Sequence, residues 1–245
     1  MIMAWTLKDN IPPEPASVTD LIDGDLDEVV ELDVRDRGLR RLPEDLGRLR
    51  KLRILDVTKN QLDVLPDTLG DLVELRSLHA FRNNLTALPS SIGRCRHLTF
   101  LDVDSNPLQT LPAELVQLTA LEALDFSRTQ VTTLPSGLEN LPIHWLALSR
   151  LPDNADSILP HWPVIDLTFR EMSEVDITAT IALLPPAVTR LSLFYNNLTT
   201  WPQALNKLDL VSLDIWDSAF DFPDLRACCS PLKTGHVLTG FGAWQ

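Results

Sequence analysis

One short pattern returns at a nearly fixed interval along the chain. Residues 52–66 read LRILDVTKNQLDVLP, and related segments begin at residues 75, 98 and 121. The copies begin at Val29, Leu52, Leu75, Leu98, Leu121, Ile143, Val164, Val188 and Leu210. The first four steps are 23 residues long, and the later ones are 22, 21, 24 and 22. A period this short predicts a solenoid of stacked coils, because no single copy can bury its apolar face alone.

Each copy follows the pattern L-x-x-L-x-L-x-x-N-x-L-x-x-L-P. Apolar residues at the fourth and sixth positions alternate with polar ones, which indicates a strand. Asparagine follows at the ninth position in four copies: Asn60, Asn83, Asn106 and Asn196. Its amide can bond backbone groups in a tight turn, so stacked copies should line these side chains into a column. The Leu-Pro pair then predicts the first turn of a short return helix.

These repeats resemble the leucine-rich repeat family, in its 23-residue class with the Leu-Pro return segment. Similar repeats occur in Ras-suppressor-type scaffolds and in the recognition portions of bacterial effectors. The resemblance covers residues 29–229 and implies an α/β fold, a right-handed solenoid or horseshoe. It also implies a parallel sheet on the concave face and short helices or 3-10 turns on the convex face. In the family the concave face is usually a protein-binding surface.

The predicted organisation has three parts. Residues 1–28 form an acidic N-terminal cap, where SVTDLIDGDLDE predicts a capping helix begun by Ser17 or Thr19. Residues 29–229 hold the nine repeats, and residues 230–245 form a C-terminal cap or tail. Repeats six and seven carry Leu151 and Met172 where asparagine belongs, and neither can make the bonds of an amide. This segment has either drifted or been reshaped for one partner.

Composition excludes some classes of function. The chain has 34 acidic and 21 basic residues, and the net charge of −13 argues against nucleic-acid binding. No apolar run approaches the roughly 20 residues of a membrane span, and no secretory signal is evident. The three cysteines, Cys95, Cys228 and Cys229, give neither a disulfide framework nor metal-ligand spacing. We therefore expect a cytoplasmic monomer, with secretion as an effector left open.

The variable positions of the strands suggest a binding surface. Positions three, five, seven and eight face away from the core, and over nine repeats they hold 11 acidic and 7 basic residues. They also hold six of the 15 aromatic residues in the chain, and exposed aromatic side chains are common interface anchors. The predicted protein-binding residues are Phe81, Phe100, Asp102, Asp104 and Asp125 with Trp145 beside them, and Phe194, Tyr195 and Trp216 as a second anchor.

The resulting hypothesis is a non-catalytic module that binds a folded protein on its concave face. Two alternatives remain: an inhibitor or immunity protein that neutralises a basic toxin or nuclease, and a bacterial effector that recruits a host protein. An enzyme is disfavoured, because no Ser-His-Asp or Cys-His assembly stands out and GFGAWQ is not a nucleotide loop. A metal at the row Asp56, His79 and Asp102 is a further, weaker hypothesis. No catalytic residue, cofactor or metal is predicted, and neither nucleic acid nor a membrane is an expected partner.

Overall fold

The computed structural model describes residues 5–161, 166–169, 171–186, 188–193, 196, 198–200, 202–215, 236–239 and 242–243. The chain divides into two compact units. The first comprises Met1–Glu122 and Thr129–Pro142, and the second comprises Ala123–Arg128 and Ile143–Gln245. Each of the nine strands β3 to β11 begins at the third position of a predicted repeat.

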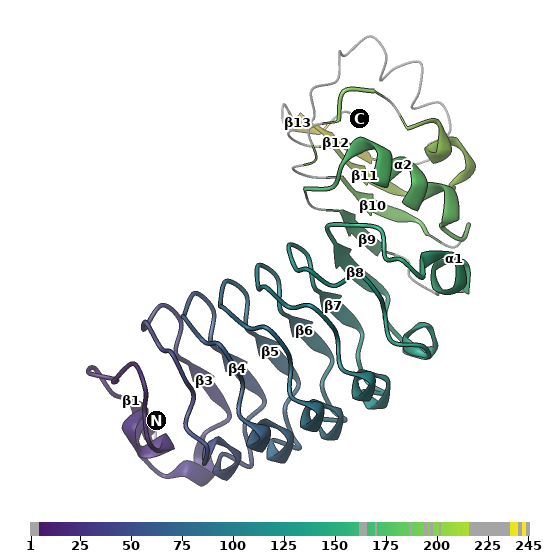
Figure 1. The fold of residues 1–245 in the computed structure, drawn as a ribbon. Helices are drawn as coiled ribbons and strands as arrows, with labels where there is room; N and C mark the ends of the chain where they lie inside the picture. Colours follow the sequence, from purple (N-terminus) through teal and green to yellow (C-terminus); the bar gives the residue numbers. More distant parts are fainter. Residues whose placement is uncertain are drawn as a thin grey trace. The chain divides into compact units, whose positions relative to one another are not determined.

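The first unit contains six strands and seven 3-10 helices among its described residues. The strands are β1 (Trp5–Leu7), β2 (Ile22–Gly24), β3 (Glu31–Asp33), β4 (Ile54–Asp56), β5 (Ser77–His79) and β6 (Phe100–Asp102). The 3-10 helices are η1 (Val18–Asp20), η2 (Leu26–Glu28), η3 (Leu46–Arg48), η4 (Asp67–Asp71), η5 (Ser90–Arg94), η6 (Ala113–Gln117) and η7 (Leu138–Asn140). Strands β1 and β2 pair antiparallel, whereas β3 to β6 are parallel neighbours on one side of the coils, with the 3-10 helices on the other (Figure 1).

The strands pair in register, repeat position against repeat position. Asp33 lies opposite Asp56, Asp56 opposite His79, and His79 opposite Asp102. The predicted row of fifth-position side chains is therefore confirmed across these four strands. The predicted solenoid is confirmed as well, with 3-10 turns forming its return segments.

Each coil sends a regular set of apolar side chains inward. In the coil that begins at residue 52, seven of them are at most 1% exposed: Leu52, Leu55, Val57, Leu62, Leu65, Leu69 and Leu72. They recur at fixed repeat positions, so each coil covers the apolar faces of the coils beside it. In the next coil Cys95 occupies the last of these positions and is fully buried.

The asparagine column predicted from the ninth position is present. The Asn83 side chain accepts a hydrogen bond from Leu62 N at 3.1 Å and donates to Val57 O and Ala80 O at 3.0 and 3.1 Å. Asn60 and Asn106 make the equivalent bonds in their own coils. One amide thus ties two successive coils together.

The residue before this asparagine has a left-handed backbone. Lys59, Arg82 and Ser105 have φ between 54° and 56°, and Asp36 has φ 55° at the same repeat position. Such a conformation costs a residue other than glycine on the order of 1 kcal/mol or more. The bonds of the neighbouring asparagine stabilise the turn and offset this strain.

The N-terminal cap differs from its prediction. Ser17 does begin a helix, with a complete capping box to Asp20, but this 3-10 turn ends at Asp20. The predicted single helix over SVTDLIDGDLDE is wrong, because Ile22–Gly24 form β2 instead and Asp25 begins a second 3-10 turn. With Gly24 at φ 113°, the chain turns sharply at that point.

Asp45 fastens this cap to the first coil. Its carboxylate accepts hydrogen bonds from Ser17 Oγ at 2.7 Å and Val18 N at 2.8 Å, and it pairs with Arg48 at 3.1 Å. Burial acts to raise the pKa of Asp45, but the bonds from Ser17, Val18 and Arg48 outweigh it and hold the pKa below its usual value.

We expect Asp45→Ala to lower the free energy of unfolding by about 1 kcal/mol at neutral pH, because the Ser17 and Val18 donors lose their acceptor. The stabilisation from a depressed pKa is fully present above the unfolded pKa of about 3.9 and is lost as the pH falls through the folded pKa. The difference between wild type and variant should therefore shrink as the pH falls through the folded pKa of Asp45. Urea denaturation at several pH values checks this, with Glu44→Ala as an exposed control, and a difference that does not change with pH would contradict it.

The second unit contains seven strands, two α-helices and two 3-10 helices among its described residues. The strands are β7 (Ala123–Asp125), β8 (Trp145–Leu148), β9 (Asp166–Phe169), β10 (Arg190–Ser192), β11 (Ser212–Asp214), β12 (His236–Thr239) and β13 (Gly242–Ala243). The helices are α1 (Ala155–Ile158), η8 (Leu159–His161), α2 (Glu174–Leu183) and η9 (Gln203–Lys207). Strands β7 to β12 are parallel neighbours, and β13 pairs antiparallel with β12.

The irregular repeats six and seven lie in this unit. Their return segments contain the α-helices α1 and α2 in place of single 3-10 turns. The Met172 side chain is buried where asparagine was expected, and its backbone N donates to Asn196 Oδ1 at 2.8 Å. Repeat eight therefore still bonds to repeat seven through Asn196, although repeat seven has no asparagine of its own at this position.

Candidate protein-binding face

The side chains at repeat positions three, five, seven and eight of β3 to β6 and their following turns form one surface, which we call the first strand face. Thr58 and Asp104, both at position seven, are buried within it. These positions alternate with the fully buried Leu32, Leu55, Leu78 and Leu101. Phe81 and Phe100 are half-buried on this surface and do not point into the core. The ring positions are thus accessible to a partner.

Aromatic side chains cluster on β5 and β6. The His79 and Phe100 rings are neighbours, with centroids 4.9 Å apart and planes inclined by 36°. His79 Nε2 lies 2.8 Å from Ser77 Oγ, a hydrogen bond within the same strand. The guanidinium carbon of Arg82 lies 5.8 Å from the centroid of the Phe81 ring, a cation–π contact.

The fifth-position carboxylates have a structural task. Asp56 Oδ1 accepts a hydrogen bond from Thr58 N, and Asp102 Oδ1 accepts one from Asp104 N, both at 3.0 Å. Each carboxylate therefore satisfies the backbone N–H two residues further on, where the strand ends. The strand period predicts only exposed charge at these aspartates and does not indicate this role.

Arg35 bridges two neighbouring carboxylates at the N-terminal end of the face. It lies 2.7 Å from Asp33 Oδ2 through Nη2 and 3.4 Å from Asp56 Oδ2 through Nε. The hydrogen bond from Arg35 is the main cause that lowers the pKa of Asp33, and it outweighs burial, which acts in the opposite direction. The self-repulsion of the aspartate row is thereby reduced.

The predicted site residues do not all lie in one place. Phe81, Phe100, Asp102 and Asp104 belong to the first unit, whereas Asp125 and Trp145 belong to the second. Asp104 and Asp125 are each only 2% exposed, and Asp125 accepts hydrogen bonds from Ser127 N and Oγ at 2.9 and 2.5 Å. Trp145 is half-buried at the start of β8. The second predicted anchor lies outside the described residues: Phe194, Tyr195 and Trp216.

The first unit also has a pocket that the sequence reasoning missed. Its volume is about 580 Å³, and it lies against η2, η3 and η4, whereas the predicted site lies on the strands. It is lined by Gly24, Asp25, Leu26, Asp27, Asp45, Gly47, Arg48, Arg50, Thr68 and Asp71.

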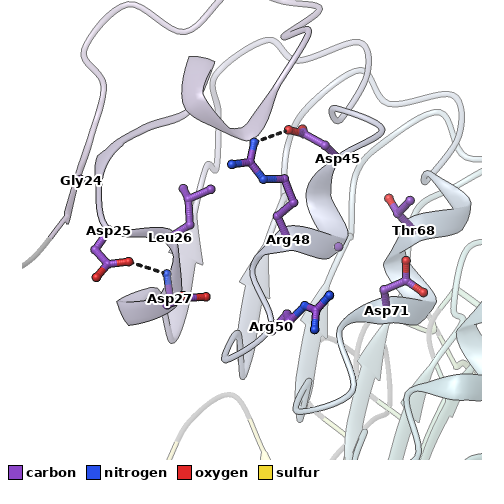
Figure 2. Close-up of a pocket in the computed structure, with 10 residues that line it drawn as sticks. Gly24, Asp25, Leu26, Asp27, Asp45, Arg48, Arg50, Thr68 and Asp71 are labelled. Atoms are coloured by element: carbon purple, nitrogen blue, oxygen red, sulfur yellow. Dashed lines mark hydrogen bonds and ion pairs between the residues drawn. The ribbon is translucent and has the colours of Figure 1, made fainter.

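Figure 2 shows two contacts among the residues of this pocket: Arg48 pairs with Asp45, and the backbone N of Asp27 donates a hydrogen bond to Asp25. Asp71 pairs with Arg94 at 3.4 Å. In the sequence, the acidic N-terminal segment was the only feature that pointed to this pocket.

Other chemistry is limited. Within the described part of the chain, no group of three or more histidine, cysteine or carboxylate side chains could hold a metal ion, the row Asp56, His79 and Asp102 included. Burial raises the pKa of the Cys95 thiol to about 11, and its Sγ donates to Leu69 O. No helix among the described residues is long and apolar enough to cross a membrane.

Parallel strands and return turns stacked into a solenoid, with a face of variable side chains, define the class of solenoid repeat proteins. Residues 67–143 match a family model described as a leucine-rich repeat region. These residues thus form a leucine-rich repeat region, and the chain has the solenoid fold of leucine-rich repeats.

Solved structures show the same fold. The leucine-rich repeat protein LIC12759 of Leptospira interrogans is 24% identical, with a TM-score of 0.60, over 87% of this chain and 56% of that one. The functional domain of InlJ from Listeria monocytogenes is 23% identical, with a TM-score of 0.53, over 80% and 46%. An internalin, InlF, from Listeria monocytogenes is 18% identical, with a TM-score of 0.52, over 87% and 67%.

The chain thus spans about half the length of the first two of these structures. Among curated protein sequences no match is found. Leucine-rich repeat folds are generally protein-binding modules, and the family's members are generally not catalytic.

Proposed function

We propose that the chain is a non-catalytic module that holds a folded protein against its strand-lined surface. The observation that carries the proposal is the half-buried pair Phe81 and Phe100 on the first strand face. These rings occupy positions that alternate with fully buried leucines, so packing of the core does not require them. Aromatic side chains in such places are the usual source of binding energy at protein interfaces.

Charge supplies the second part of the proposal. The sixteen positions of the first strand face hold six acidic and three basic residues, a net charge of −3. Asp102 lies beside the rings, and the buried Asp104 adds negative charge from beneath the surface. The proposed partner therefore presents a basic patch, which the carboxylates orient while the rings provide affinity. In the second unit Trp145 is the proposed anchor, and Asp125 belongs to the neighbouring strand β7.

The test compares proteins retained from an extract of the native cells. The double variant Phe81→Ala/Phe100→Ala should lose a partner that the wild type retains. The matched control Val64→Ala/Val73→Ala removes exposed apolar side chains of the same unit, 49% and 52% exposed, away from the strand face. The control should keep the partner, and circular dichroism should show both variants folded. Equal retention by all three proteins would contradict the proposal.

With the captured partner purified, Trp145→Ala should weaken binding by about 2 kcal/mol, roughly thirtyfold in Kd. Isothermal titration calorimetry measures this change directly. An unchanged Kd in a folded variant would remove Trp145 from the site, while leaving the first strand face to be judged by its own variants.

A further inference from the structure

We propose that Phe100, Asp102 and His79 form a subsite for the guanidinium group of an arginine side chain on the partner. This inference rests on the proposed function, since it assigns the chemistry of one contact within it. The proposed ligand group is a planar cation with hydrogen-bond donors at its edge.

The three groups have the geometry that such a cation requires. Phe100 and Asp102 are two residues apart in β6, so their side chains leave the same face about 6.6 Å apart along the strand. His79 is the register neighbour of Asp102 on β5, and its ring lies 4.9 Å from that of Phe100. A guanidinium plane laid on the Phe100 ring would thus have the Asp102 carboxylate at its edge and the imidazole beside it.

The hydrogen bond between Ser77 Oγ and His79 Nε2, 2.8 Å long, restrains the imidazole ring. The bond from Asp104 N to Asp102 Oδ1 restrains the carboxylate in the same way. The subsite is therefore held in place before a ligand arrives, which lowers the entropic cost of binding.

On the same surface, guanidinium groups of the chain itself already make both kinds of contact, one with an aromatic ring and one with a carboxylate. Arg82 lies over the ring of Phe81, and Phe81 is two residues after His79 in the chain. Arg35 forms a two-point contact with Asp33, with Nε at 2.9 Å from Oδ1 and Nη2 at 2.7 Å from Oδ2. A ring contact and a carboxylate contact occur separately there, whereas Phe100 and Asp102 place a ring and a carboxylate side by side.

Arginine fits this arrangement better than lysine. A guanidinium is planar, stacks on an aromatic face and donates several hydrogen bonds in its plane, whereas an ammonium is a compact and strongly hydrated charge. Since the basic residues of the first strand face are outnumbered two to one by acidic ones, a cationic side chain also meets a favourable field there.

The experiment uses the full chain and three small probes, each a derivative of a single amino acid. Nα-acetyl-arginine amide is titrated while the amide resonances of His79, Phe100 and Asp102 are followed by NMR. The citrulline counterpart keeps the shape without the charge, and the lysine counterpart keeps the charge without the plane. We expect saturable shifts at these three residues with arginine, about tenfold weaker binding with citrulline, and an intermediate affinity with lysine.

Variants locate the binding. Phe100→Leu keeps an apolar side chain but removes the aromatic face, and Asp102→Asn removes the charge while its side-chain oxygen can still accept from Asp104 N. Each should weaken arginine binding about fivefold. The matched control Asp33→Asn makes the same change in the same row and should leave the affinity unchanged.

Equal binding of citrulline and arginine, or arginine affinity unaffected by Asp102→Asn, would overturn the subsite. So would shifts that map elsewhere on the chain. This outcome is separable from failure of the proposed function. If the Phe81→Ala/Phe100→Ala variant still loses its partner while the arginine probe fails to bind, the strand face stands as an interface and only the assigned chemistry is wrong.

Discussion

Gly70→Ala is expected to lower the free energy of unfolding by about 3 kcal/mol, the upper part of the range for overpacked sites. A Cβ at residue 70 would lie 2.8 Å from Ser91 Cβ and 2.7 Å from Arg94 Nε, and closer still to the backbone oxygen of Ser91. Since that oxygen belongs to the next coil, the return turns η4 and η5 would have to separate. The lower entropy of the unfolded alanine chain offsets only about 0.4–1 kcal/mol of this cost. Urea denaturation followed by circular dichroism measures the change.

Gly38→Ala is the control for this substitution. A Cβ at residue 38 would meet no atom within 4 Å. The φ of +67° at this residue nevertheless strains most side chains, because few residues other than glycine adopt a left-handed backbone readily. We expect a loss of about 1 kcal/mol there and a smaller loss for Gly38→Asn. If Gly70→Ala were no worse than Gly38→Ala, close packing of the return turns would not be the reason for glycine at residue 70.

Asn83→Ala is expected to cost about 3 kcal/mol of stability as well, because it leaves one buried backbone N–H without an acceptor and removes two further buried hydrogen bonds. The Leu62 N–H loses its acceptor. The carbonyls of Val57 and Ala80 each lose one of two asparagine donors and keep the other, from Asn60 and Asn106 respectively. The affected groups lie in two coils, so hydrogen exchange should rise at amides on both sides of the substitution. Asn83→Asp should be at least as damaging, since it keeps the acceptor but buries a charge.

The adjacent residue offers a matched control. Asn84 is exposed, and its one side-chain bond reaches Gln61 O at 3.5 Å. Asn84→Ala should therefore stay within about 0.5 kcal/mol of the wild type. A comparable loss of stability in the two variants would mean that the asparagine column is not the source of the effect.

The residues that recur at fixed repeat positions predicted most of the fold. Leucines at fixed spacing predicted the coil and its buried positions, and the ninth-position asparagines predicted the column that Asn60, Asn83 and Asn106 form. These features are predictable because one physical requirement, burial or backbone bonding, allows few residue types at each place. The glycines at residues 47, 70 and 93 recur at the same repeat position and could have been found in the same way.

Other features left no such trace in the sequence. The left-handed residues before Asn60, Asn83 and Asn106 are lysine, arginine and serine, because the surrounding bonds and not the residue type enforce the conformation. In the cap, the 3-10 turn from Ser17 ends after one turn because Ile22–Gly24 pair with β1, a tertiary contact that local propensity does not record. In the candidate site, the burial of Asp104 and Asp125 depends on how neighbouring turns pack and not on the strand period.

The fifth-position aspartates limit how this surface can change over evolution or in protein engineering. Those of the first strand face, Asp33, Asp56 and Asp102, are partly exposed and each accept a backbone N–H. Reversing the charge to lysine would remove an acceptor that the coil needs, whereas asparagine would keep it. Selectivity for a new target is thus more readily acquired at the third-position side chains, such as Ile54, Ser77 and Phe100, than along the aspartate row.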